Sequence, residues 1–81
     1  MEATETARLT VLAERLNCLT EDDLLLLAGI TPTTAETWRK RGEGPGFVRA
    51  GRRVLYPAAA VAAWLASRTR ERREVDARGM L

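Results

Sequence analysis

The segment Thr31–Gly42, with the sequence TPTTAETWRKRG, concentrates hydroxyl, carboxylate and cationic side chains on what its end residues predict to be one short helix. Such groups could hydrogen-bond to the edges of DNA bases, while arginines at the end of the helix could bind phosphates. A scaffold helix could carry the same residues, because cations favour the last turn of any helix. We expect the bulky Trp38 to pack in the core, which leaves the opposite face available for binding. The candidate binding residues on and beside that face are Thr33, Glu36, Thr37, Arg39, Lys40 and Arg41.

A second cluster of cations follows in the segment FVRAGRRVLY, residues 47–56, which has the β-prone residues and the Ala50-Gly51 turn of a hairpin. Its arginines crowd together, and like charges on neighbouring strands repel each other in the free protein. An anionic partner such as a phosphate would relieve that repulsion. The predicted phosphate-binding residues of this hairpin are Arg49, Arg52 and Arg53.

Formal charge is distributed unevenly, although the whole chain of 81 residues carries only +2. Residues 1–23 contain two cations and six anions, a net charge of −4, whereas residues 39–53 contain six cations and one anion, a net charge of +5. Codon bias could explain why twelve arginines stand against one lysine, but it does not explain why the charges segregate. A local basic face matters more for nucleic-acid binding than the total charge does.

These candidate residues must be positioned by neighbouring helices, whose limits are marked by capping residues. Thr20 and Thr31 can each cap the free amides of a first helical turn, and Gly29 can take the left-handed conformation that often ends a helix. Pro32 suits a first helical position, and the sequence GEGPG after Arg41 cannot continue a helix. The pattern predicts helices over residues 2–17, 20–29, 32–41 and 57–74, with the hairpin between the last two.

A helix, a helix-turn-helix, a hairpin and a final helix follow one another in the order of a winged helix-turn-helix, which is a DNA-binding architecture. We therefore expect a mainly α fold with a small β-hairpin wing, preceded by an extra N-terminal helix. Val61, Trp64 and Leu65 form the predicted inner stripe of the last helix. The expected divisions are an amphipathic N-terminal helix over residues 1–18, the winged helix-turn-helix over 19–66, and a basic helical extension with a frayed tail over 67–81.

A set of short motifs follows in order along the chain, namely Leu19-Thr20, Gly29-Ile30-Thr31, Trp38, Gly42, Arg49-x-Gly51-Arg52, Tyr56-Pro57 and Trp64-Leu65. In this combination the segment 19–65 resembles the MerR-like winged helix-turn-helix of phage and plasmid excisionases, also called recombination directionality factors, and of their small regulator relatives. The resemblance implies sequence-specific binding to double-stranded DNA, with the helix at 32–41 in the major groove and the wing on the adjacent minor groove or backbone. Relatives usually carry polar groups where this chain has Ala58, Ala59, Ala62 and Ala63.

Several leucines lack an obvious partner if the winged motif stands alone. Leu9, Leu12 and Leu16 share one face of the N-terminal helix, and Leu26 points away from the face that its own helix buries. We hypothesise that these leucines meet, either within one chain or between protomers. The acidic N-terminal segment could equally approach the basic wing of a neighbouring protomer on DNA, since the resembling excisionases act through several protomers that bend DNA.

The leading hypothesis from the resemblance is an excisionase that binds attachment-site DNA cooperatively, bends it and promotes excision by a phage integrase. A small transcriptional regulator of a phage or mobile element would use the same domain. A protein-interaction module such as an antitoxin is an alternative of another class, although it would have no need of three arginines in the wing.

Enzymatic and membrane functions find little support in the residue types. The chain has no histidine and a single cysteine, and it shows no nucleophile–base pair or metal-ligand spacing, so we expect no catalytic residue, cofactor or metal. No apolar run approaches the roughly 20 residues that a membrane helix needs, and the N-terminus lacks the pattern of a signal peptide. We expect a cytoplasmic, nucleoid-associated protein of a bacterial host cell.

Overall fold

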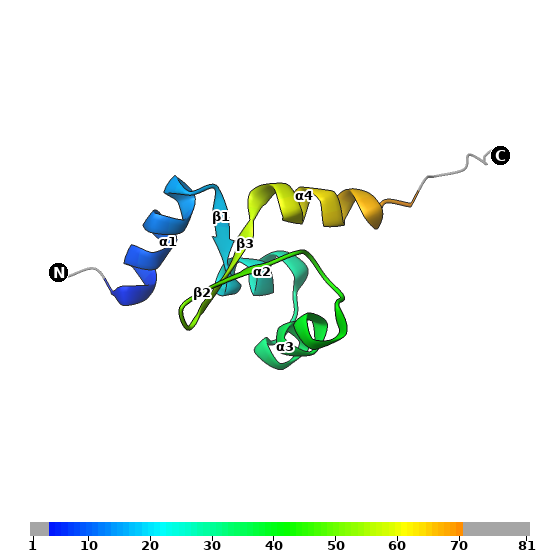
Figure 1. Ribbon diagram of the computed structural model, residues 1–81, viewed down its shortest axis with the longest axis horizontal. Helices are drawn as coiled ribbons and strands as arrows, with labels where there is room; N and C mark the ends of the chain where they lie inside the picture. The colour runs from blue at the N-terminus through cyan, green and yellow to red at the C-terminus, as the bar shows by residue number, and fades with distance from the viewer. Residues whose placement is uncertain (1–3, 71–81) are drawn as a thin grey trace.

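The computed structural model describes residues 4–70 and shows four helices around a small antiparallel sheet (Figure 1). The fold is a winged helix-turn-helix preceded by an additional helix, which confirms the predicted fold class. The three strands of the sheet lie in the order β1-β3-β2. Along the chain the elements are α1 (Glu5–Arg15), β1 (Cys18–Thr20), α2 (Glu21–Ala28), α3 (Pro32–Arg41), β2 (Val48–Ala50), β3 (Arg53–Pro57) and α4 (Ala58–Ser67).

Capping residues set the limits of the helix-turn-helix formed by α2 and α3. The Thr20 hydroxyl accepts a hydrogen bond from Asp23 N, and the Asp23 carboxylate accepts one from Thr20 N, both at 3.1 Å. This reciprocal pair satisfies two backbone donors that the first turn of a helix leaves free. The Thr31 hydroxyl caps α3 by accepting a hydrogen bond from Thr34 N at 3.2 Å. Gly29 ends α2 with a φ of 67°, a left-handed conformation that glycine adopts without strain.

The sheet contains a strand that the sequence analysis does not predict. β1 pairs antiparallel with β3, so that Leu19 lies opposite Tyr56. The sequence predicts only the entry to α2 here, because three residues are too few to show the alternation that identifies a strand. The pairing continues beyond β1, where Ala58 N donates to Asn17 O at 2.7 Å. β1 thus connects α1 to the sheet that carries the wing.

The hydrophobic core lies where β1 and β3 meet α2 and α4. Leu24, Tyr56 and Val61 are each at most 4% exposed, and Leu19 and Val54 pack against them. Fully burying a side chain of this kind contributes about 1.5–3 kcal/mol before the entropy cost of ordering the chain is subtracted. The core therefore holds α2 against the strand from which the wing projects.

A pair of tryptophans ties α3 to α4. The ring centroids of Trp38 and Trp64 are 5.5 Å apart and the rings are tilted by 54°, a favourable arrangement for an aromatic pair. Trp38 thus packs on the inner side of α3, as the sequence analysis expects. Gly44 lies against the Trp38 ring, where an added Cβ would come within 2.5 Å of Cε3.

The first helix is shorter than predicted. α1 begins at Glu5, after the side chain of Thr4 accepts a hydrogen bond from Ala7 N at 3.0 Å. It ends at Arg15 and does not reach residue 17, because Asn17 takes a positive φ of 56° and turns the chain into β1. Positive φ is tolerated by asparagine better than by most residues.

The last helix also ends earlier than predicted. α4 stops at Ser67, so the basic residues Arg68 and Arg70 follow the helix and are exposed. The remainder of the predicted helix and the predicted frayed tail, residues 71–81, lie outside the described part of the chain. Leu65, expected in the inner stripe, is 47% exposed, whereas Val61 is buried, so the core covers a narrower face of α4 than the sequence suggests.

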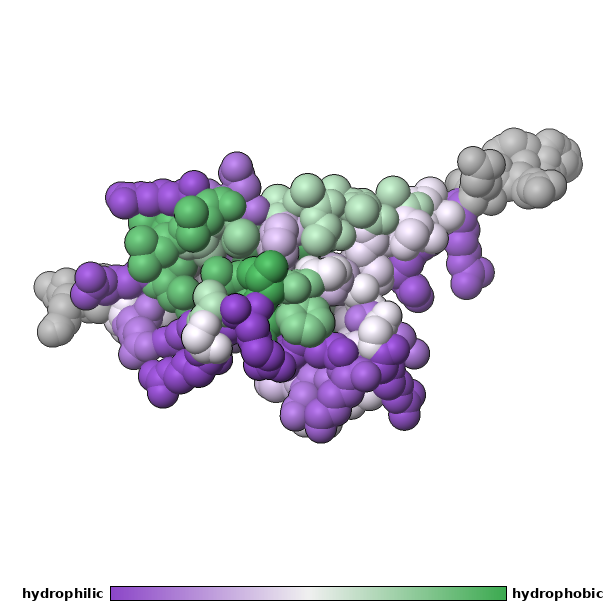
Figure 2. Space-filling model, viewed as in Figure 1, coloured by the Kyte–Doolittle hydropathy of each residue, from purple (hydrophilic) through white to green (hydrophobic). Residues whose placement is uncertain are grey.

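The surface divides into regions of different polarity. Figure 2 shows hydrophobic side chains gathered over α1 and along α4. Hydrophilic side chains gather along the edge that carries α3 and the tip of the hairpin between β2 and β3. The elements that carry the candidate binding residues, α3 and the hairpin, lie at this second, polar edge of the molecule.

Candidate nucleic-acid interface

α3 turns one face to the core and the opposite face to solvent. Ala35 is fully buried and Trp38 is half-buried, which orients the rest of the helix. Thr37, one of the predicted binding residues, is half-buried. The predicted binding residues of α3 that are exposed are Thr33, Glu36, Lys40 and Arg41.

One ion pair lies on the outer face of α3. Lys40 Nζ is 3.4 Å from a carboxylate oxygen of Glu36, one helical turn earlier, and both side chains are more than half exposed. Exposed pairs of this kind contribute little to stability, so either side chain can turn to another partner at small cost. The pair leaves both groups free to form hydrogen bonds with a ligand.

Arg39 is largely covered by its neighbours, which differs from the exposed position beside the outer face that the sequence predicts for it. Its side chain is only 13% exposed, and Nη1 donates a hydrogen bond to the Tyr56 hydroxyl at 2.8 Å. The same nitrogen lies 3.7 Å from a Glu21 carboxylate oxygen, and the guanidinium carbon is 6.0 Å from the Phe47 ring centroid. Helical spacing alone could not reveal these partners, because they come from three other segments.

The environment of Arg39 favours its charged form. Burial opposes the charge, but the hydrogen bond to Tyr56 and the negative charge of Glu21 outweigh that penalty, so the pKa of Arg39 is raised. Its Nε atom is buried without a hydrogen-bond partner among the described residues. Arg39 therefore links α3 to α2 and β3, and it helps to fix where the outer face of α3 stands relative to the wing.

β2, β3 and the turn between them form the wing. The turn connects Ala50 to Arg53, which are the last paired residues of the two strands, and Gly51 in the turn has a φ of 63°. Arg49 and Arg52 are exposed, and the side chain of Arg53 is 41% exposed. All three predicted wing arginines thus have a guanidinium that solvent can reach.

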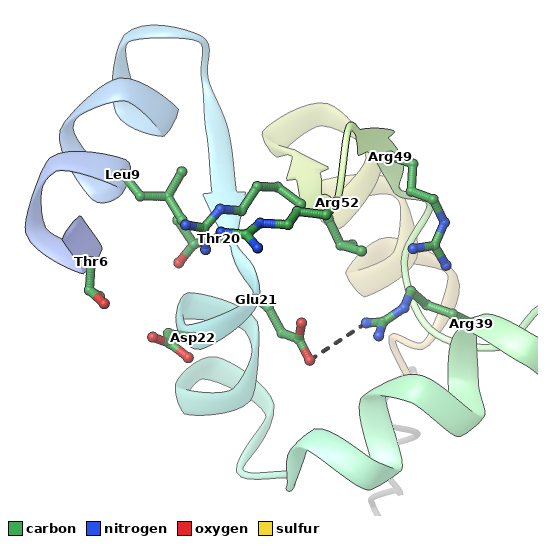
Figure 3. Close-up of a pocket in the computed structure, with 10 residues that line it drawn as sticks. Thr6, Leu9, Thr20, Glu21, Asp22, Arg39, Arg49 and Arg52 are labelled. Atoms are coloured by element: carbon green, nitrogen blue, oxygen red, sulfur yellow. Dashed lines mark ion pairs between the residues drawn. The ribbon is translucent and has the colours of Figure 1, made fainter.

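The outer residues of α3 and the wing line a common hollow. A cavity of about 290 Å³ is lined by Glu36, Arg39, Lys40, Phe47 and Arg49. Arg39 and Arg49 also line a neighbouring cavity of about 280 Å³, together with Arg52 and Arg53. Figure 3 shows the guanidinium of Arg49 close to the end of α3 that carries Arg39, with Arg52 reaching into the same cavity from the wing. The wing arginines and part of the outer face of α3 therefore lie on one side of the molecule.

Carboxylates also belong to this region, and the sequence analysis misses them. Glu21 and Asp22, from the first turn of α2, line the same cavity as the arginines. Glu5 of α1 pairs with Arg53 of the wing across 48 positions of sequence. From the sequence, the acidic N-terminus could approach the wing of a neighbouring protomer, whereas in the structure Glu5 pairs with the wing of its own chain. The segregated charges were the signal, but they could not show which groups meet.

The leucines predicted to form a protomer contact do not cover one another within the chain. Leu9 is half-buried, whereas Leu12, Leu16 and Leu26 are 53%, 66% and 85% exposed. Val11, which the predicted stripe omits, is also exposed and extends the apolar surface of α1. We call Val11, Leu12 and Leu16 the α1 patch.

Other kinds of site are absent from residues 4–70. No group of three or more His, Cys, Asp or Glu side chains in this part of the chain could hold a metal ion. No helix among these residues combines the length and the apolar character that crossing a membrane requires. Cys18 is a half-buried free thiol whose Sγ donates to Leu16 O at 3.5 Å.

Comparisons with known proteins bear on this interface. A comparison with curated proteins found no match to the chain. A comparison with protein families matches residues 18–69 to a family described as a helix-turn-helix domain. The matched residues run from β1 past the end of α4, so they include α2, α3 and the wing and leave α1 outside. Because more than half of the chain is matched, the chain belongs to this helix-turn-helix family of DNA-binding domains.

Proposed function

We infer that the chain is an excisionase, a recombination directionality factor that binds attachment-site DNA cooperatively, bends it and promotes integrase-mediated excision. The observation that carries this proposal is that the molecule has two separate surfaces, one polar and one apolar. The outer face of α3 and the wing arginines line two neighbouring hollows that share Arg39 and Arg49, while the α1 patch stays uncovered elsewhere. A polar face for DNA together with a separate apolar face suits a protein that binds DNA in several copies.

The base-contacting residues in this proposal are the exposed polar side chains of α3 and the half-buried Thr37. Threonine can bond to base edges or touch the methyl group of thymine, Glu36 can accept from cytosine N4, and Lys40 can reach guanine or phosphate. Replacing Thr33 or Lys40 with alanine should change which sequence is selected from random DNA. Replacing Arg52 with alanine should instead weaken binding to all sequences, because a phosphate contact carries no sequence information.

The α1 patch is the proposed contact between protomers on DNA. Leu12→Gln and Leu16→Gln remove apolar surface without altering charge, and both side chains are already more than half exposed. On DNA with two adjacent sites, these variants should lose cooperativity while keeping the affinity for a single site. Ala63→Gln, an exposed change on α4, is the matched control and should bind as the wild type does. Unchanged cooperativity in both leucine variants would remove the α1 patch from the proposal.

Footprinting with and without the cognate integrase distinguishes excision from transcriptional regulation. The flanking genomic DNA would be footprinted with the full chain, with and without the cognate integrase, and excision would be followed on a substrate carrying both attachment sites. We expect protected direct repeats next to the integrase sites, a bend in that DNA, and excision that depends on the chain. Protection of a promoter alone, with excision unaffected, would favour a small transcriptional regulator, which shares the same domain.

A further inference from the structure

Phe47 presents an aromatic ring to a hollow whose other lining side chains are polar. The cavity of about 290 Å³ between α3 and the wing is lined, besides Phe47, by Glu36, Arg39, Lys40 and Arg49. Phe47 is 37% exposed and does not belong to the cluster that forms the hydrophobic core. The ring therefore offers an apolar surface beside Glu36 and Lys40, the exposed side chains of α3 proposed above to contact bases.

The neighbours of Phe47 fix the position of its ring. The ring centroid lies 6.3 Å from that of Tyr56, with the rings tilted by 55°, and 6.0 Å from the guanidinium carbon of Arg39. Tyr56 is 1% exposed and the side chain of Arg39 is 13% exposed, so both supports are themselves held by their surroundings. The next residue, Val48, is already paired with Leu55 in the sheet. A ring supported in this way has little freedom to lose when it meets a ligand, which favours a specific contact.

The base edges in the major groove include one apolar group that suits such a ring. Most groups there donate or accept hydrogen bonds, whereas thymine also presents its 5-methyl group. A phenylalanine side chain has no hydrogen-bonding atom to offer the polar groups, but it can pack against the methyl. An apolar ring among base-contacting polar side chains is therefore matched to thymine rather than to the other three bases.

We propose that Phe47 packs against the 5-methyl group of one thymine in the bound site and so selects thymine at that position. The thymine lies next to a base pair that Glu36 or Lys40 contacts, because the three side chains line one cavity. This inference rests on the proposed binding of DNA by the outer face of α3. It adds a residue from the segment before β2 that reads a base.

Deoxyuridine tests this contact, because it differs from thymidine only in lacking the 5-methyl group. The full chain would be titrated against its selected site in duplexes that each carry one such replacement. For the wild type, we expect one replacement to weaken binding by roughly fourfold, next to the base pair whose preference changes in Lys40→Ala. The factor should be the same at low and high salt, because an apolar contact releases no counterions.

Variants of Phe47 and of its neighbour assign the methyl contact to one residue. In Phe47→Ala, the replacement that weakens binding of the wild type should have no effect. Val48→Ala is the matched control, because Val48 is 46% exposed but does not line the cavity, and it should keep the fourfold factor. Each factor compares two duplexes on the same protein, so a fraction of unfolded chains cancels from it.

A crosslink on the wild-type chain decides the question if Phe47→Ala binds too weakly to titrate. In 5-iododeoxyuridine, an iodine takes the place of the methyl group, and irradiation links the base to an adjacent aromatic ring. We expect the peptide linked at the sensitive position to contain Phe47. A chain that binds no duplex DNA would overturn the proposed function together with this contact. DNA binding in which no thymine methyl matters, in which the factor persists in Phe47→Ala, or in which the crosslink falls on another residue would overturn the contact alone.

Discussion

Replacing Tyr56 with phenylalanine would remove one oxygen atom from the centre of the molecule and leave the shape of the core nearly unchanged. That oxygen accepts the 2.8 Å hydrogen bond from Nη1 of Arg39. Tyr56 is 1% exposed and the Arg39 side chain is 13% exposed, so water is poorly placed to replace the lost acceptor. Nε of Arg39 is already buried without a partner, so the variant would add another unsatisfied donor to a buried cation.

The expected loss of stability follows from this geometry. A buried donor left without a partner costs about 1–3 kcal/mol, and the cost is higher when the donor is charged. For a domain of this size each kcal/mol shifts the Tm by roughly 4–8 °C, so a loss of about 2 kcal/mol should lower the Tm by roughly 8–16 °C. Because the pKa of Arg39 is raised, the guanidinium stays charged at neutral pH and loses its contribution only in strongly alkaline solution.

Urea and thermal unfolding, followed by circular dichroism, measure this loss. Ser67→Ala is the matched control, because it also removes one hydroxyl, which donates to Trp64 O at 2.7 Å in an exposed position. The control should change the free energy of unfolding by no more than about 0.5 kcal/mol. Adding Arg39→Met to Tyr56→Phe should recover part of the loss, since the buried charge is then removed as well. A Tyr56→Phe variant as stable as the Ser67→Ala control would refute this role for Arg39.

Two further predictions concern the wing and the loop after α3. Glu5→Gln should release Arg53 from its ion pair, raise the affinity for DNA and steepen the salt dependence by up to about 0.9, whereas Glu14→Gln should leave the slope unchanged in the same anisotropy titration. Gly44→Ala should lower the free energy of unfolding by more than Gly42→Ala does. Both glycines have positive φ, but only at Gly44 would the new Cβ strike the tryptophan of α3, and equal losses in urea would show that the clash is relieved elsewhere.

The parts of the fold that depend on local sequence could be predicted. Thr20 and Thr31 predict the starts of α2 and α3 because each can cap the turn that follows it, and Gly29 predicts the end of α2. The hairpin follows from β-prone residues on both sides of Gly51. In each case the physical cause lies within about four residues of its effect, so one sequence is enough to find it.

The parts that depend on distant residues could not be predicted. β1 is a strand only because β3 lies beside it, and three residues carry no periodic pattern of their own. Arg39 lies next to exposed residues in the helix, yet its guanidinium turns inward and donates a hydrogen bond to the Tyr56 hydroxyl. The contact of Glu5 with Arg53 likewise needs the β1–β3 pairing, which brings α1 to the wing. The charge pattern indicated a basic face, but only the tertiary structure shows which arginines are already paired.

The salt dependence of DNA binding tests the central claim, that α3 and the wing arginines act together on one duplex. The measurement is a fluorescence anisotropy titration of the full chain at several salt concentrations, for the wild type, for Arg49→Ala with Arg52→Ala, and for Arg15→Ala as a control on α1. We predict that the double wing variant binds more weakly and that its slope of log K against log salt is shallower by about 1.8, or about 0.9 for each lost phosphate contact. Equal affinity and an equal slope for the double variant and the wild type would contradict the account.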